Sequence, residues 1–246
     1  MTTNVIGIDC AVNPADVGLA FGTFSDGHTA VEHALQCGRH DSPSDIVADW
    51  IHSHADPTLI AMDAPLGWPR ALGQALATHR AGQGVDIPAH DLFRRHTDVF
   101  IKKTIGKQPL DVGADRIART AHSALELIAT VARRLDDTIA LAWTPDVTGI
   151  AAIEVYPAAT LAAHGIDARG YKTADGHAAR QRIVETLQTH MGISTDIPGI
   201  AKRSDALDAM ICLLAAQDFL AARAIAPPDG IPVEREGWIW VREITP

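Results

Sequence analysis

Two short apolar segments near the start of the chain each end in an aspartate. Residues 5–8 (Val-Ile-Gly-Ile) precede Asp9, and residues 59–62 (Leu-Ile-Ala-Met) precede Asp63. Apolar runs of this length, closed by turn-forming residues, are typical of buried β-strands. We expect a helix between the two strands and a right-handed crossover that makes them parallel neighbours. Sites gather outside the carboxyl ends of such strands, so both aspartates are expected at one edge of the sheet.

The rest of the pattern predicts an α/β chain. A helix is expected over residues 43–53, because Ser42 is a capping residue and Pro43 suits the first helical position. Further strands are expected at residues 17–24, 29–36, 151–156 and 238–241, and further helices at residues 115–135, 178–189 and 204–224. We therefore expect a single domain over residues 1–246, with a mixed five-stranded sheet in the order 3-2-1-4-5, strand 2 antiparallel and helices on both faces. A helical insertion is expected between strands 4 and 5, at residues 65–150.

Composition limits the class of protein. With 246 residues, of which 47% are hydrophobic, the chain can form a sizeable core, and a disordered chain is excluded. The 30 acidic and 21 basic residues give a net charge of −9, which argues against a surface coated with basic groups but leaves room for a local basic patch. The three cysteines form no CxxC pair, and the sequence has no signal-peptide pattern and no apolar run long enough to span a membrane. We expect a cytoplasmic protein with no membrane partner.

A second acidic feature lies near the C-terminus, where Asp205 and Asp208 open an apolar helix. Three residues apart, the two side chains share one face of the helix. Asp205 has a structural explanation, because an acidic residue in the first turn is stabilised by the helix dipole. Asp208 lies among apolar residues on a helix that is apolar nearly all round, so it is expected to be buried. A buried carboxylate needs hydrogen-bond partners or a metal.

If the carboxylates of Asp9, Asp63 and Asp208 converge, they repel one another unless cations neutralise them. Hard divalent cations prefer oxygen ligands of this kind, so we expect Mg²⁺ or Mn²⁺ as the cofactor. Two bridging ions would require the carboxylates to lie within roughly 4–8 Å of each other and would support hydrolysis of a phosphodiester. For Asp9 and Asp63 an alternative stays open, in which each forms a turn with a neighbouring backbone amide.

Six motifs are spread over almost the whole chain: Gly7-Ile-Asp9-Cys-Ala11, Ile60-Ala-Met-Asp63-Ala-Pro-Leu-Gly67-Trp-Pro69, Glu154-Val-Tyr-Pro157-Ala, Tyr171-Lys172, Asp205-Ala-Leu-Asp208-Ala and Glu236-Gly-Trp-Ile-Trp240. With these motifs the chain resembles domain of unknown function 429, a family of predicted ribonuclease H-like nucleases. The Asp205–Asp208 arrangement is also similar to that of Holliday-junction resolvases of the same superfamily. The chain departs from ribonuclease H proper, which has a catalytic glutamate on the helix after strand 3, where this chain has Asp45 and Asp49.

The resemblance implies a ribonuclease H-like fold and a nuclease that uses divalent metal ions. It implies that Asp9, Asp63 and Asp208 bind the metal, supported by Asp205 and Glu154. The role of Glu154 stays open between a further ligand or general base and a solvated glutamate at the edge of the sheet.

Basic residues are concentrated between residues 91 and 135. This segment contains nine basic and five acidic residues, a local charge of +4 in a chain of net charge −9. This segment could neutralise nucleic-acid phosphates, bind a small phosphorylated ligand, or form a solvated helix face. The candidate substrate-binding residues are Arg94, Arg95, Lys102, Lys103 and Lys172. Lys172 would place its ammonium on a phosphate.

We therefore expect a metal-dependent nuclease whose partner is a nucleic acid, with DNA or RNA and the oligomeric state left open. One alternative is an actin-like, kinase-related phosphate-binding protein. Such proteins need two duplicated halves of the fold and glycine-rich phosphate loops. This chain shows only one such half, and Cys10-Ala-Val12 follows Asp9 where glycines would be needed. The other alternative is a non-catalytic ligand-binding protein on the same fold that retains the acidic residues.

Overall fold

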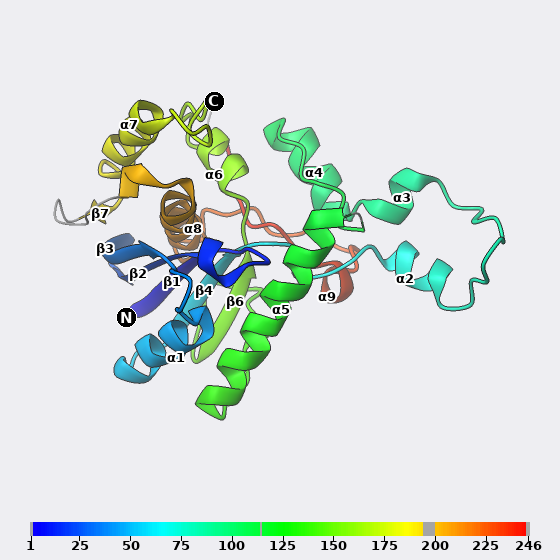
Figure 1. Cartoon of the computed structure of the whole chain (residues 1–246), viewed down its shortest axis with the longest axis horizontal. Helices are drawn as coiled ribbons and strands as arrows, with labels where there is room; N and C mark the ends of the chain where they lie inside the picture. The colour runs from blue at the N-terminus through cyan, green and yellow to red at the C-terminus, as the bar shows by residue number, and fades with distance from the viewer. Residues whose placement is uncertain (1, 114, 194–199, 245–246) are drawn as a thin grey trace.

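The computed structural model describes residues 2–113, 115–193 and 200–244. Within these ranges the chain forms an α/β structure, in which one mixed sheet is packed between helices (Figure 1). The strands are β1 (Thr3–Asp9), β2 (Gly18–Ser25), β3 (His28–Gln36), β4 (Thr58–Asp63), β5 (Ala140–Leu141), β6 (Ile150–Glu154) and β7 (Gly192–Ile193).

The described strands form a seven-stranded sheet in the order β5-β6-β4-β1-β2-β3-β7. This corrects the expected five-stranded sheet and its order 3-2-1-4-5. The two additional strands, β5 and β7, have two residues each and lie at the two edges, and segments this short carry no readable apolar pattern. Between them, β2 is antiparallel to β1 and β3, whereas β4 is parallel to both β1 and β6.

The first helix follows three successive strands, and four helices follow β4 in succession. The helices are α1 (Pro43–Ser53), α2 (Arg70–Leu76), α3 (Ala89–Phe93), α4 (His96–Ile105), α5 (Asp115–Leu135), α6 (Pro157–Ala163), α7 (His177–Leu187), α8 (Ser204–Leu220) and α9 (Val233–Glu236), with 3-10 turns at Pro14–Asp16 and Ile200–Lys202. The expected start of α1 is confirmed, because the Ser42 side chain accepts a hydrogen bond from the amide of Asp45 and Pro43 lies at the first position.

The strand expected at residues 238–241 is absent from the described structure. In its place, an isolated parallel bridge joins Glu154 to Ile239, and an antiparallel bridge joins Ala224 to Arg242. Trp238 and Trp240 are buried all the same, in the same apolar core as the α8 side chains. Ile239 and Val241 are buried as well, in a different apolar cluster, so the four residues alternate between two clusters without forming a strand.

Two apolar cores cover the two faces of the sheet. Ile6 of β1 lies in one core with Val47 of α1 and Val131 of α5. Its neighbour Val5 lies in the other core, with Leu207 of α8. Successive side chains of a strand point to opposite faces, so a continuous apolar run is the expected sequence for a sheet covered on both sides.

Helix α8 lies directly on the sheet at β1 and β2. A side chain at Gly7 would overlap the carbonyl oxygen of Ala209, and one at Gly18 would overlap the carbonyl oxygen of Asp205. Glycine therefore allows the backbones of α8 and the sheet to approach closely. This contact brings the first two turns of α8 over the end of β1.

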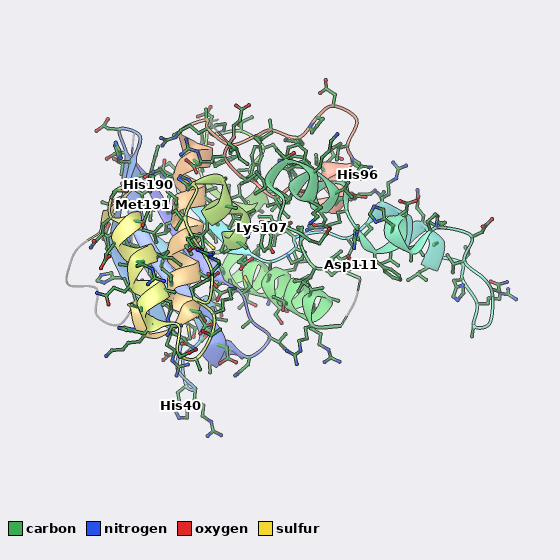
Figure 2. All side chains as sticks on the ribbon, turned by 90° about the horizontal axis from the view of Figure 1, so that it is seen from above. His40, His96, Lys107, Asp111, His190 and Met191 are labelled. Atoms are coloured by element: carbon green, nitrogen blue, oxygen red, sulfur yellow. The ribbon has the colours of Figure 1, made fainter. Side chains whose placement is uncertain are left out.

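The region expected to be an insertion contains α2, α3, α4, α5 and β5. Helices α2 and α3 form an arm that extends away from the sheet, and Figure 2 shows His96 and Asp111 near its base. Helix α5 behaves differently, because it packs beside α1 against the sheet. None of the helices in the described part of the chain is long and apolar enough to cross a membrane.

Candidate active site

Asp9 and Asp63 are the last residues of β1 and β4, and they are paired in register across the two parallel strands. Both residues are half-buried and line a cavity of about 430 Å³ together with Tyr156 and Lys172. Among the described residues, none donates a hydrogen bond to either carboxylate. The alternative in which these aspartates form turns with neighbouring amides therefore finds no support in their contacts.

Asp208 comes from α8, and only 1% of the residue is exposed. Its Oδ1 accepts a hydrogen bond of 2.7 Å from the hydroxyl of Tyr171, and its Oδ2 lies 2.8 Å from the Lys172 ammonium. Tyr171 and Lys172 belong to the loop between α6 and α7. The expectation of a buried carboxylate with partners is thus met by two protein groups.

The charges of these carboxylates act on the pKa values of Asp9 and Asp63. Burial raises the pKa of Asp9 well above its ordinary value, and the charges of Asp63 and Asp208 add to this effect. Burial and the Asp208 charge raise the pKa of Asp63 to about 7. Lys172 lowers both pKa values, and Asp205 raises that of Asp9. Asp9, Asp63, Asp208 and Lys172 therefore form one electrostatic unit, called the acidic site below.

Lys172 is the cation of the acidic site. Burial disfavours its charge, but the charges of Asp208, Asp63 and Asp9 outweigh burial and raise the pKa of the ammonium. Its side chain is 58% exposed, so it reaches from the solvent side into the acidic site. The sequence motif identified this residue as a candidate phosphate contact, whereas the contact shown here is with Asp208.

Glu154 does not join the acidic site as a free carboxylate. Its Oε1 lies 2.7 Å from Nη2 of Arg95 and its Oε2 lies 2.8 Å from Nη1, while the amide of Leu66 also donates to Oε2 at 2.9 Å. Only 3% of Glu154 and 1% of Arg95 are exposed. Of the two alternatives for Glu154, the structure excludes the solvated edge residue, and it shows that Arg95, a candidate substrate-binding residue, is buried.

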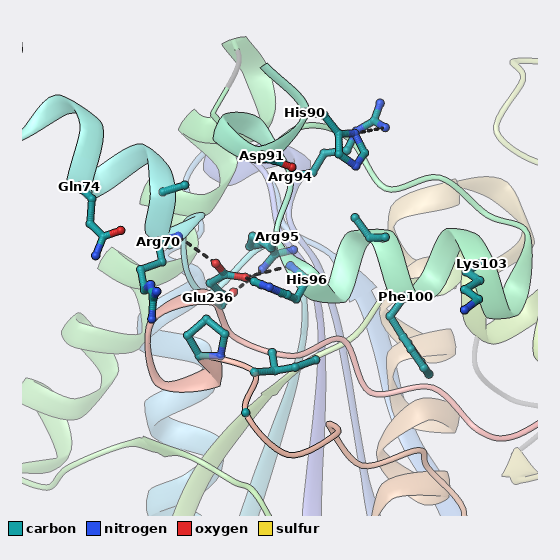
Figure 3. A pocket seen from close by; sticks show the side chains of 15 residues that line it. Arg70, Gln74, His90, Asp91, Arg94, Arg95, His96, Phe100, Lys103 and Glu236 are labelled. Carbon is teal, nitrogen blue, oxygen red and sulfur yellow. Dashed lines mark hydrogen bonds and ion pairs between the residues drawn. The ribbon is translucent and has the colours of Figure 1, made fainter. Parts of the chain in front are cut away.

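Arg95 is the centre of a buried polar network with Asp98, Glu154 and Glu236, called the Arg95 network below. Its guanidinium donates to both oxygens of Asp98 and to the carbonyl oxygen of Glu236 as well as to Glu154. The Glu236 carboxylate in turn accepts from the amides of Arg70 and His96, at the first residues of α2 and α4, and from the His96 ring (Figure 3).

Two glycines allow the Arg95 network to close. A side chain at Gly67 would come within 2.5 Å of the carbonyl oxygen of Arg235, and one at Gly237 would come within 3.0 Å of Oε2 of Glu154. Gly237 also has a φ of 75°, which favours glycine. Three of the six sequence motifs, those containing Gly67, Glu154 and Glu236, therefore meet in one structural unit.

Sequence reasoning missed the Arg95 network, although one signal was available. Arg95 and Asp98 are three residues apart at the start of a helix, a spacing at which such side chains interact. The partners at positions 154 and 236 have no such local signature.

The remaining basic candidates lie outside the acidic site. Lys102 and Lys103 are exposed on α4, and Arg94 forms a half-exposed ion pair with Asp111. Arg94 and Lys103 line a second cavity, of about 570 Å³, on the side of the Arg95 network that holds Glu236 (Figure 3).

Comparisons with known proteins place the chain in a family. A search of curated proteins finds no match. Among solved structures, T. thermophilus RuvC in complex with a Holliday junction substrate is similar, with 12% sequence identity and a TM-score of 0.38 over 88% of this chain and 94% of that chain. The model of the family described as protein of unknown function DUF429 matches residues 7–231, and the chain belongs to this family.

Proposed function

We propose that the protein is a divalent-metal-dependent nuclease on a ribonuclease H-like fold, formed by a single domain over residues 1–246 with an insertion at residues 65–150. The observation that carries this proposal is the register pairing of Asp9 with Asp63. Their carboxylates end adjacent parallel strands and line a cavity. The carboxyl ends of parallel strands are the usual place for a site in a sheet of this kind.

The residues of the acidic site fit a hard divalent cation, Mg²⁺ or Mn²⁺. Asp9 and Asp63 would hold it, because carboxylate oxygens are its preferred ligands. No three histidine, cysteine, aspartate or glutamate side chains in the described ranges are arranged as a metal site. Two carboxylates are sufficient for Mg²⁺, which keeps several waters and uses substrate phosphates as further ligands. When bound, the ion acts as a Lewis acid on phosphate oxygens and activates water.

Other residues of the chain assist in binding the phosphodiester. Lys172 presents an ammonium at the cavity that holds Asp9 and Asp63, where it would contact a phosphate oxygen. Exposed basic residues of α4 and α5 would attract the rest of a nucleic-acid backbone without regard to sequence; they are Lys102, Lys103, Arg116 and Arg119. Such a patch matters in a chain of net charge −9, because it provides a local surface that does not repel a polyanion.

A hydrolysis assay tests the proposal. Wild-type protein is incubated with single-stranded, double-stranded and branched DNA and with RNA, in Mg²⁺, in Mn²⁺ or with a chelator. We expect cleavage of at least one substrate only with metal, and a loss of at least about 100-fold in Asp63→Asn, because the ligand charge is removed. Asp49→Asn, at an exposed aspartate of α1, is the matched control and should keep full activity.

Two results would contradict the proposal. Metal binding without cleavage of any substrate would favour the non-catalytic ligand-binding alternative. Hydrolysis of ATP without cleavage of nucleic acid would favour the phosphate-binding, kinase-related alternative.

A further inference from the structure

Lys172 contacts the one carboxylate of the acidic site that comes from α8, that of Asp208. Its ammonium is 2.8 Å from Oδ2 of Asp208, and the Tyr171 hydroxyl is 2.7 Å from Oδ1. Each oxygen of the Asp208 carboxylate therefore has a protein partner already, and one of these partners carries a full positive charge. A divalent ion at Asp208 would have to displace that ammonium or lie next to it against charge repulsion.

The position of Lys172 is built into the fold. The buried side chain of Arg180 donates from Nη1 to the carbonyl oxygens of Tyr171, at 2.6 Å, and Thr173, at 3.0 Å. Its Nε donates to the carbonyl oxygen of Ala201 at 2.8 Å. Ala201 lies in the turn that leads into α8, so Arg180 joins the Lys172 loop to the helix that carries Asp208. Hydrogen bonds from Arg180 therefore fix the backbone on both sides of Lys172.

The charges of the acidic site also favour one ion. Asp9, Asp63 and Asp208 carry three negative charges when ionised, and Lys172 contributes one positive charge within their electrostatic reach. These four groups sum to a charge of −2, which one divalent cation neutralises. Asp205 also acts on Asp9, but more weakly than Asp63, Asp208 or Lys172 does. A second divalent ion would leave the acidic site with a net positive charge, at a cost that is high for partly buried groups.

We propose that Lys172 is a built-in cation that takes the place of a second metal ion, so that the acidic site binds one divalent ion, on Asp9 and Asp63. The inference rests on the proposed function in that it assumes the same metal site. Asp208 then serves as a positioning residue that holds the Lys172 ammonium beside the metal ligands. The single ion and the ammonium together face the phosphodiester.

The test is the number of Mn²⁺ ions that the metal-free protein binds, measured by calorimetric titration and by electron paramagnetic resonance. Wild type should bind one ion per chain. Lys172→Met removes the positive charge and frees Asp208, so this variant should bind two ions. The first of them should bind at least about tenfold more tightly than the single ion of the wild type. Two ions about 3.5–4 Å apart would also couple magnetically and change the resonance spectrum.

Two variants serve as controls. Lys172→Arg keeps the charge and should bind one ion, as should Lys202→Met, at an exposed lysine outside the acidic site. Two ions in wild type, or a single ion in a folded Lys172→Met, would overturn the inference and leave the proposed metal site standing. Failure of the wild type and of every variant to bind Mn²⁺ would overturn both the inference and the proposed metal site. None of these readouts depends on hydrolysis.

Discussion

The guanidinium of Arg95 and the carboxylate of Glu154 face each other through two parallel hydrogen bonds, of 2.7 and 2.8 Å, in the interior of the protein. This pair connects the residue before α4 to the last residue of β6. Bidentate pairs of this kind combine strength with a defined geometry. Arg95 and Glu154 also line the cavity that holds Asp9 and Asp63. This part of the cavity wall is therefore stabilised by charge pairing as well as by apolar packing.

The first prediction concerns the stability that depends on this pair. Arg95→Leu leaves Glu154 and Asp98 buried without their partner, so the free energy of unfolding should fall by about 3–5 kcal/mol. The neighbouring variant Arg94→Leu breaks only a half-exposed ion pair with Asp111 and should cost about 1 kcal/mol or less. Urea unfolding of both variants and wild type measures the difference. Equal losses in the two variants would show that the Arg95 network does not stabilise the fold.

The second prediction concerns pH. The pKa of Asp63 is raised from 3.8 to about 7 by burial and by the Asp208 charge. The folded state therefore holds this proton more tightly than the unfolded state does. The resulting stabilisation is fully present below the unfolded pKa and is lost as the pH rises through about 7.

Melting temperatures in the presence of a chelator, measured from pH 4 to pH 8, check this expectation. Metal-free wild type should lose stability relative to Asp63→Asn as the pH rises, because the amide cannot ionise. Added Mn²⁺ should restore the melting temperature of the wild type at pH 8 and leave that of the variant unchanged, since a ligand stabilises only a state that binds it. Parallel profiles for the two proteins without metal would contradict the prediction.

The third prediction concerns the contact between β1 and α8. Gly7→Ala would place a methyl group against the carbonyl oxygen of Ala209 and force α8 away from the sheet. We expect a loss of about 1–3 kcal/mol, as for other overpacked cores, together with weaker Mn²⁺ binding. Gly73→Ala in α2 is the control, because its methyl group meets nothing within 4 Å. This control should leave the free energy of unfolding unchanged or raise it by up to about 1 kcal/mol, a difference that chemical denaturation can resolve.

The fourth prediction concerns the basic residues of α4 and the turn before it. If Arg94, Lys102 and Lys103 bind phosphates, their replacement by glutamine should reduce the slope of log K against log salt by about 0.7–0.9 for each phosphate that is no longer neutralised. Arg95 is left intact, because it is buried. A control triple of exposed residues elsewhere, Arg39, Arg182 and Lys202, should leave the slope unchanged. Filter binding or fluorescence anisotropy over a range of salt concentrations gives both slopes, and equal slopes would mean that the α4 surface is merely solvated.

Local patterns in the sequence were sufficient for much of the fold. The helix expected at residues 115–135 has those bounds in the structure, and Ser42 caps α1 as expected. The strands ending at Asp9 and Asp63 are parallel neighbours in register. Apolar periodicity and caps act over a few residues, so their effect can be read along the chain.

The partners of the buried charges were decided by the tertiary structure. Lys172 is bound to Asp208, and Arg95 to Glu154, across separations in the chain over which no spacing rule applies. The edge strands β5 and β7 are defined in the same way, by pairing with a neighbour rather than by a pattern of their own. A buried charge must be matched by whichever opposite charge the packing brings within reach. The sequence by itself therefore predicted Asp9, Asp63 and Asp208 as candidate residues at strand ends and on an apolar helix. Only the packing of distant segments determined which cations Asp208 and Glu154 contact.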